Sequence, residues 1–204
     1  MHPHQFNLFG SQETLSTPKP KDKSTVLATG RFKLFFALRP LPEAAQAIAQ
    51  KSVELGRIHG IQGSLVLADH LHISLHSVGL YETIPQSALD AACRAGAALH
   101  SDGFEVVFDQ AMSFNQGTYV LCPGEGTQAI QGLYLSLGMA MADAGFAKRA
   151  ANFTPHMTLS YRGQLVAKHS IAPLRWRACE VVLINSHQGA GVHEVLGRWP
   201  LNAD

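Results

Sequence analysis

The sequence contains two short strand-like motifs with the same pattern, His72-Ile73-Ser74-Leu75 and His156-Met157-Thr158-Leu159. Side chains of a β-strand alternate between its two faces. Each motif therefore carries a histidine and a hydroxyl on one face and apolar residues on the other. The apolar face has to be buried, which leaves the polar face at the edge of a core. Because the two histidines lie 84 positions apart (156 − 72 = 84), we expect each half of the chain to contribute one such strand.

The polar face of each motif has the groups that phosphate chemistry uses. A hydroxyl can donate a hydrogen bond to a phosphate oxygen, and an imidazole can take up or release a proton near neutral pH. We therefore interpret His72 and His156 as catalytic residues and Ser74 and Thr158 as phosphate-binding residues. A single histidine in a strand is more often a core residue with a backbone partner, and one H-x-[ST] pattern recurs by chance. The matched pair favours catalysis.

This pair of motifs resembles the 2H phosphoesterase superfamily, and within it the bacterial LigT-like branch of 2',5' RNA ligases, the RNA 2',3'-cyclic phosphodiesterases. Residues 31–38, 153–159 and 195–201 are similar to the opening strand, the second motif and the closing strand of that branch. The resemblance implies a bilobed α+β fold, with two antiparallel-sheet lobes, helices outside and a central active-site groove. Ser74 replaces the threonine more usual in the first motif and keeps the hydroxyl.

The resemblance also implies an activity, the hydrolysis of an RNA or nucleoside 2',3'-cyclic phosphate to the 2'-phosphate. No metal or other cofactor takes part: His156 activates water and His72 protonates the 3'-oxygen. The reverse reaction would join RNA ends through a 2',5' linkage. The implied partner is an RNA or oligonucleotide with a 2',3'-cyclic phosphate end, or a cyclic nucleotide. Because one histidine must be neutral and the other charged, the rate should follow a bell in pH. Both limbs should lie near ~6.5, moved somewhat upward by the phosphate charge.

Charge and composition limit the other classes of function. The 204 residues include 16 Lys and Arg and 15 Asp and Glu, which gives no general attraction for nucleic acid, so polyanions must be bound at a local site. Residues 1–29 are polar and aperiodic, and we expect a mobile tail before a single domain of residues 30–204. The three scattered cysteines indicate neither disulfides nor zinc. Without a signal-peptide pattern or a membrane-length apolar run, we expect a monomeric cytoplasmic protein that makes no membrane contact.

Hydrophobic periodicity predicts the secondary structure and indicates only the α+β class. We expect Phe114 and Tyr119 to be core residues, and His187 and His193, which flank the last turn, to have no role. The predicted helices cover residues 42–59, 85–100 and 127–144. The predicted strands cover the second motif and residues 31–38, 64–67, 71–78, 104–114, 118–122, 179–186 and 192–199.

Two alternatives remain open. Strand alternation would place His70, His72 and His76 on one face, where they could bind a metal, although the pattern lacks the acidic ligands and partners of hydrolytic metal sites. The chain would then be a metal hydrolase. Without turnover, it would be an RNA-end or nucleotide-binding protein. We instead expect no metal, with His70 and His76 in the groove wall. His76, Arg149 and Arg162 are candidate substrate contacts, the last because alternation would turn it toward the motif threonine.

Overall fold

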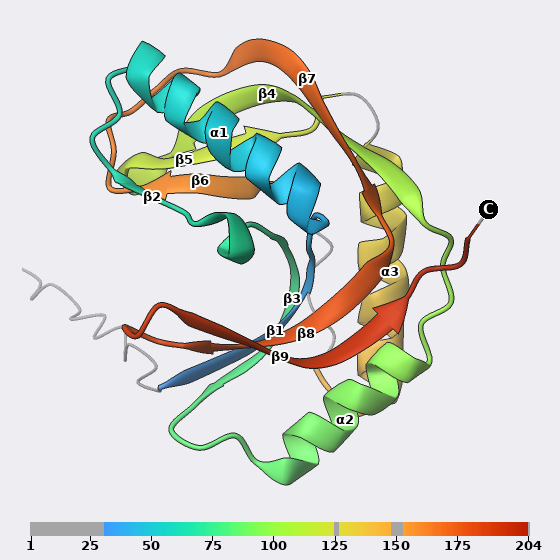
Figure 1. The fold of residues 1–204 in the computed structure, drawn as a ribbon. Helices are drawn as coiled ribbons and strands as arrows, with labels where there is room; N and C mark the ends of the chain where they lie inside the picture. The colour runs from blue at the N-terminus through green and yellow to red at the C-terminus, as the bar shows by residue number, and fades with distance from the viewer. Residues whose placement is uncertain (1–30, 125–126, 148–152, 204) are drawn as a thin grey trace, which may run out of the picture.

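The computed structural model describes residues 31–124, 127–147 and 153–203, so the predicted tail lies outside the described residues. The described part forms nine β-strands in one sheet and three α-helices (Figure 1). The α+β class is thus confirmed. In chain order the elements are β1 (Phe32–Leu38), α1 (Pro42–Ile58), β2 (Ser64–Leu65), the 3-10 turn η1 (Ala68–His70), β3 (Ile73–Tyr81), α2 (Gln86–Ala97), β4 (Phe104–Phe114), the turn η2 (Asn115–Gly117), β5 (Thr118–Cys122), α3 (Thr127–Asp143), β6 (Met157–Tyr161), β7 (His169–Ala178), β8 (Glu180–His187) and β9 (Val192–Pro200).

The two motif strands, β3 and β6, are neighbours in the middle of the sheet. The strand order is β7-β4-β5-β6-β3-β1-β8-β9, with β2 paired to β6, and the strand pairs are antiparallel. A single residue pair, Ile73 with Met157, joins β3 to β6. Four strands of this order lie on each side of the junction, and each side contains one motif. The sheet is continuous through the junction, and the two-lobe arrangement stays a prediction.

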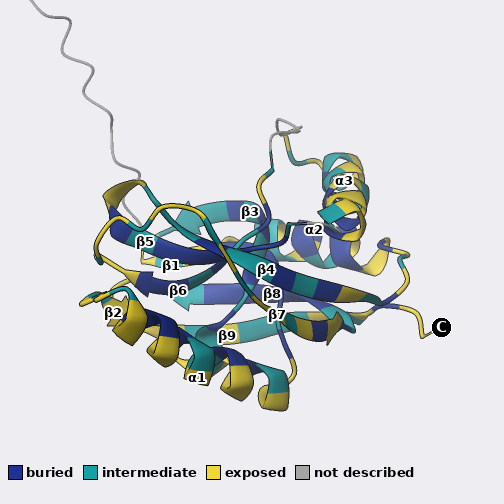
Figure 2. Cartoon of the chain, turned by 90° about the horizontal axis from the view of Figure 1, so that it is seen from above, coloured by how far each residue is buried: buried dark blue, intermediate teal, exposed yellow. Residues whose placement is uncertain are grey.

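Apolar residues at the expected spacing explain the position of the core. Every residue from Leu34 to Leu38 is buried. Alternate residues of this run point into the main core on one face of the sheet. Phe35 and Ala37 point to the other face, where they pack against side chains of the neighbouring strand β8. Helix α1 packs on η1, β6 and β7, whereas α2 and α3 pack on each other and on strands β3, β4 and β9. Figure 2 shows α1 on one side of the strands and α2 and α3 on the other. None of the described helices is long and apolar enough to span a bilayer.

Strand β7 is the one described strand that the sequence patterns did not predict. It pairs only with β4 and forms one edge of the sheet. Pro173 lies within it, and a proline inside a run argues against a strand except at an edge or a bulge. Both conditions hold here, because the register slips where Phe108 pairs with Leu174 and Gln110 with Ser170. The two extra residues on β7 form a bulge that accommodates the proline.

Candidate active site

The four motif residues line one groove of about 400 Å³ at the junction of β3 and β6. Because Ile73 and Met157 pair antiparallel, a step back along one strand corresponds to a step forward along the other. Each motif histidine is therefore set across from the hydroxyl of the other motif. The four side chains thus form a rectangle, in which the imidazoles occupy two diagonally opposite corners and the hydroxyls the other two. The groove is lined by Lys33, Phe35, His72, Ser74, Thr118, His156, Thr158, Tyr161, Ser186, Gln188 and His193.

His72 is held in one tautomer by a backbone carbonyl. Its Nδ1 lies 2.6 Å from the carbonyl oxygen of His70, and its Nε2 lies 3.1 Å from Ser74 Oγ. A carbonyl oxygen only accepts hydrogen bonds, so Nδ1 carries the proton and donates it. In the neutral ring, Nε2 then accepts from the Ser74 hydroxyl. The His70 carbonyl is carried by η1, and Arg39 donates a hydrogen bond to the neighbouring carbonyl of Asp69, which holds this turn.

His156 is held in the same way. Its Nδ1 donates to the carbonyl oxygen of Thr154 at 2.9 Å, two residues earlier, as in the first motif. Nε2 is thus the nitrogen that can exchange a proton with a ligand. The ring of Phe114 stands edge-on to the imidazole, with centroids 4.9 Å apart. Each motif therefore presents an imidazole with a defined tautomer, which proton transfer in a fixed direction requires.

Burial controls the protonation of His72. It lowers the pKa of His72 from 6.5 to about 4, and the positive charges of Arg39 and Lys33 act in the same direction, while the bond to the His70 carbonyl opposes them. The imidazole is therefore neutral at pH 7 in the ligand-free protein. The sequence predicted a pH–rate profile with both limbs near 6.5. Because the pKa of His72 is lower in the free protein, the limb that this residue sets there lies well below that value.

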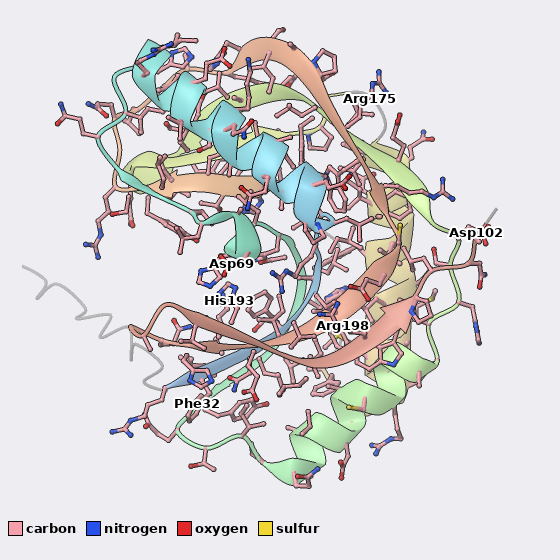
Figure 3. The ribbon with its side chains drawn as sticks, in the orientation of Figure 1. Phe32, Asp69, Asp102, Arg175, His193 and Arg198 are labelled. Atoms are coloured by element: carbon pink, nitrogen blue, oxygen red, sulfur yellow. The ribbon has the colours of Figure 1, made fainter. Side chains whose placement is uncertain are left out.

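His193 is a groove residue that sequence reasoning missed. It projects from β9 toward η1 (Figure 3). Its ring stacks on His70, with centroids 4.4 Å apart and an angle of 30°, and lies 5.4 Å from the ring of His72. Burial lowers the pKa of His193 to about 4, and the neighbouring His72 and His70 add to the effect. No local pattern marks His193. The register of β9 on β8, with β8 on β1, brings it to the groove.

His76 does not share a face with His72, so the strand-alternation premise for a three-histidine metal site is wrong. Between the pairs Phe35–Ser77 and Ala37–Ser74, β3 has one residue more than β1. This bulge turns the His76 side chain away from the face of β3 that lies next to His72, and the side chain is buried. Its Nε2 donates to the carbonyl of Tyr134 at 2.8 Å and its ring stacks on that residue. Among residues 31–124, 127–147 and 153–203, no group of three or more His, Cys, Asp or Glu side chains could hold a metal ion.

The remaining candidates lie in different places. Arg162 follows the end of β6 with a left-handed φ of 60°, so strand alternation does not apply to it. It lines an adjoining hollow, which shares Thr118 and Tyr161 with the groove. Arg149 lies outside the described residues. Tyr119 is a core residue, as predicted, whereas Phe114 is half-buried beside the second motif histidine.

An antiparallel α+β fold with two histidine–hydroxyl strands at one groove is the arrangement of the 2H phosphoesterases. A sequence model of the 2'-5' RNA ligase superfamily matches residues 40–190, most of the chain, and the chain therefore belongs to this superfamily. The resemblance inferred from the motifs is confirmed. No curated protein matches the sequence.

Solved structures show the same fold. The apo form of Escherichia coli LigT aligns with a TM-score of 0.68 at 22% identity, over 85% of this chain and 99% of LigT. A protein of Thermus thermophilus gives a TM-score of 0.64 at 20% identity, over 84% of this chain and 99% of that protein. Kluyveromyces marxianus Usb1 gives 0.51 at 13% identity, again over 84% of this chain and 99% of Usb1. The chain thus shares the fold of LigT and Usb1.

Proposed function

We propose that the protein hydrolyses the 2',3'-cyclic phosphate of an RNA end or nucleotide to the 2'-phosphate, without a metal ion. The observation that carries this proposal is the pair of oriented imidazoles. Each has its Nδ1 proton held by the carbonyl two residues earlier, and both line one groove with the two motif hydroxyls. A general acid and a general base are what in-line opening of a cyclic phosphodiester requires.

In the proposed reaction, Nε2 of His156 takes a proton from water as the water oxygen attacks phosphorus. The bond from phosphorus to the 3'-oxygen breaks, and His72 gives that oxygen a proton from Nε2. Ser74 and Thr158 donate hydrogen bonds to the non-bridging oxygens, where negative charge builds up. If the 5'-hydroxyl of another RNA replaces water, the same step forms a 2',5' linkage, with His156 again as the base and His72 again as the acid. The two histidines exchange roles when the 3'-hydroxyl attacks that linkage, the 5'-oxygen leaves and the cyclic phosphate forms again.

His72 has to carry a proton to act as the acid, yet burial keeps it neutral in the free protein. The negative charge of the bound phosphate raises the pKa of His72, because an anion within a few ångströms favours imidazolium. The proton therefore enters with the substrate or after it. In the free protein the hydroxyl of Ser74 donates to the same Nε2, so this hydroxyl has to turn to the phosphate when His72 becomes protonated.

Ligands of a relative and the shape of the site support a nucleotide substrate. Escherichia coli LigT has been crystallised with 3'-AMP, with ATP, with NADP+ and with phosphate. In the present protein Lys33 lines the groove and can contact a phosphate oxygen.

We further propose that residues 30–204 form one domain whose two sets of four strands, on either side of the β3–β6 junction, act as the two lobes of the family fold.

The test is a panel of phosphodiesters incubated with the protein in excess chelator. The panel holds an RNA ending in a 2',3'-cyclic phosphate, a free 2',3'-cyclic nucleotide, a 2',5'-linked oligonucleotide and ADP-ribose cyclic phosphate. Phosphorus NMR assigns the product phosphate to the 2'- or 3'-oxygen. We expect a 2'-phosphate from at least one cyclic phosphate, and loss of turnover in both His72→Ala and His156→Ala. Binding without turnover would make the chain a nucleotide-binding protein, and activity lost with chelator would make it a metal hydrolase.

A further inference from the structure

A second hollow continues from the groove at the His72 end. It has a volume of about 240 Å³ and shares His72, Thr158, Tyr161 and His193 with the groove. This volume is below the range typical of sites for drug-sized ligands, ~300–1,000 Å³, and suits one small group attached to the phosphate. We name it the His193 hollow. Its other walls include the run from Ser64 to Leu67.

The walls of the His193 hollow include three apolar side chains that are unusually exposed for their type. Leu65 is 44% exposed, Leu67 65% and Tyr161 49%, and all three line the hollow. An apolar patch of this kind, at the rim of a polar groove, marks a ligand site more often than a random surface. A ligand that fits both parts has an anionic end for the groove and a flat, weakly polar end for the hollow.

Two stacked imidazoles add a flat surface to the same hollow. The rings of His70 and His193 stack 4.4 Å apart, and both line the hollow. Burial lowers the pKa of His193 to about 4, so this ring is neutral at pH 7. A neutral heteroaromatic surface between leucine side chains suits a nucleobase, because bases bind proteins largely by stacking on flat side chains.

The proposed function places the nucleoside at the His72 end of the groove, and the inference rests on that function. His72 protonates the departing 3'-oxygen, so the ribose that carries this oxygen lies next to His72. The base is attached to the same ribose. We infer that the His193 hollow binds the base of the nucleotide whose cyclic phosphate lies in the groove. His193 and Leu67 are then specificity-determining residues, which favour a nucleoside over a cyclic phosphate without a base.

The hollow at the opposite end of the groove is a weaker candidate. It has a volume of about 480 Å³ and is lined by Phe114, Tyr134 and Phe153 beside His156. Tyr134 lies between His76 and Phe153, with centroids 3.9 and 4.1 Å away. A base in this hollow would lie beside His156, on the side from which water attacks, and away from the departing 3'-oxygen. Phe114 is thus the appropriate variant for testing the opposite flank.

The experiment compares adenosine 2',3'-cyclic phosphate with methyl riboside 2',3'-cyclic phosphate, in which a methoxy group replaces the base. The ratio of their kcat/KM values measures recognition of the base and cancels changes in chemistry common to both. If stacking contributes its usual energy, the wild-type ratio is roughly 5- to 100-fold. We expect His193→Ala and Leu67→Ser to lower the ratio, and His193→Phe, which keeps a flat ring, to retain it. Leu165→Ser, at a 75% exposed leucine outside the hollow, should leave it unchanged.

A ratio near one in the wild type overturns the inference, and so does a ratio that falls in Phe114→Ala but not in His193→Ala. A separate measurement distinguishes this failure from failure of the proposed function. If neither these two compounds nor any cyclic phosphate of the panel above is hydrolysed, the proposed function fails. Calorimetric titration with 2'-AMP and with methyl riboside 2'-phosphate then tests the hollow alone. Tighter binding of 2'-AMP that depends on His193 supports the inference, and equal binding of the two compounds refutes it.

Discussion

Acidification should protonate His72 only near pH 4 in the ligand-free protein. The difference between its ordinary pKa of 6.5 and a pKa of about 4 corresponds to about 3 kcal/mol against the charged ring, at ~1.36 kcal/mol per pH unit. In the unfolded chain the same histidine is protonated below about 6.5. The unfolded state therefore binds more protons between pH 6.5 and 4, and folding stability is lost as the pH falls through this window. His193 acts in the same direction, but the two rings repel each other when charged, so their contributions do not add.

A bound phosphate should reverse the effect on His72. A unit charge about 4 Å away contributes roughly 4 kcal/mol at an effective dielectric constant of 20, which exceeds the cost of burial. The pKa of His72 in the complex should therefore return to the ordinary histidine range or above it. Since kcat/KM reports on the free enzyme and kcat on the complex, and since His72 must be protonated to act as the acid, the alkaline limb of kcat/KM should lie near pH 4. The alkaline limb of kcat should lie roughly two pH units higher.

Imidazole NMR signals measured from pH 3.5 to 8, with and without a saturating 2'-nucleotide, provide the direct assay. The His72→Gln variant assigns the signal, and circular dichroism shows where the fold is lost. Calorimetry in two buffers of different ionisation enthalpy should detect uptake of up to one proton on ligand binding at pH 5 to 6. A His72 signal that titrates near 6.5 in the free protein would refute the reasoning, as would alkaline limbs of kcat/KM and kcat at the same pH.

Three further predictions concern the motif histidines, the motif hydroxyls and one glycine. The double variant of the two motif histidines should be little less active than either single variant, because the pair acts as a unit; steady-state rates measure this. Ser74→Ala and Thr158→Ala should each lose roughly 10- to 10³-fold in kcat, and only Ser74→Ala should also raise the pKa of His72, because it removes the hydroxyl that donates to the neutral ring. Gly117→Ala should lower the melting temperature, since its φ is +73° and a Cβ would clash with the backbone oxygen of Gly163; Gly132→Ala, whose Cβ would meet nothing within 4 Å, should not.

The part of the site that strand alternation controls could be predicted from the sequence. His72 and Ser74 lie two positions apart on one strand, as do His156 and Thr158, and each pair does line the groove. Alternation failed at His76, because a bulge adds one residue to β3 opposite β1. A bulge is defined by the register between two paired strands, and the sequence of one strand alone does not determine that register.

Other features depended on pairing between distant parts of the chain. His193 reaches the groove through β9, β8 and β1, and its own neighbours in sequence carry no sign of this. Strand β7 has a proline and an irregular pattern of burial, and only its position at the edge of the sheet makes it a strand. The helices were predictable to within about three residues, because helical periodicity is a local property.

The strand order has a consequence for the order in which the chain can fold during synthesis. Strands β4, β5, β6 and β7 are consecutive in the sequence and pair with one another, so they can assemble as soon as they leave the ribosome. Strand β1 can pair early with β3, but its pairing with β8 has to wait, since Phe35 pairs with Ile184, 149 residues later (184 − 35 = 149), and closing so long a span is slow. A nascent chain that ends before β8 already contains both motif histidines. It lacks Ser186, Gln188 and His193 on one wall of the groove, so the groove should be complete only when the last two strands have emerged.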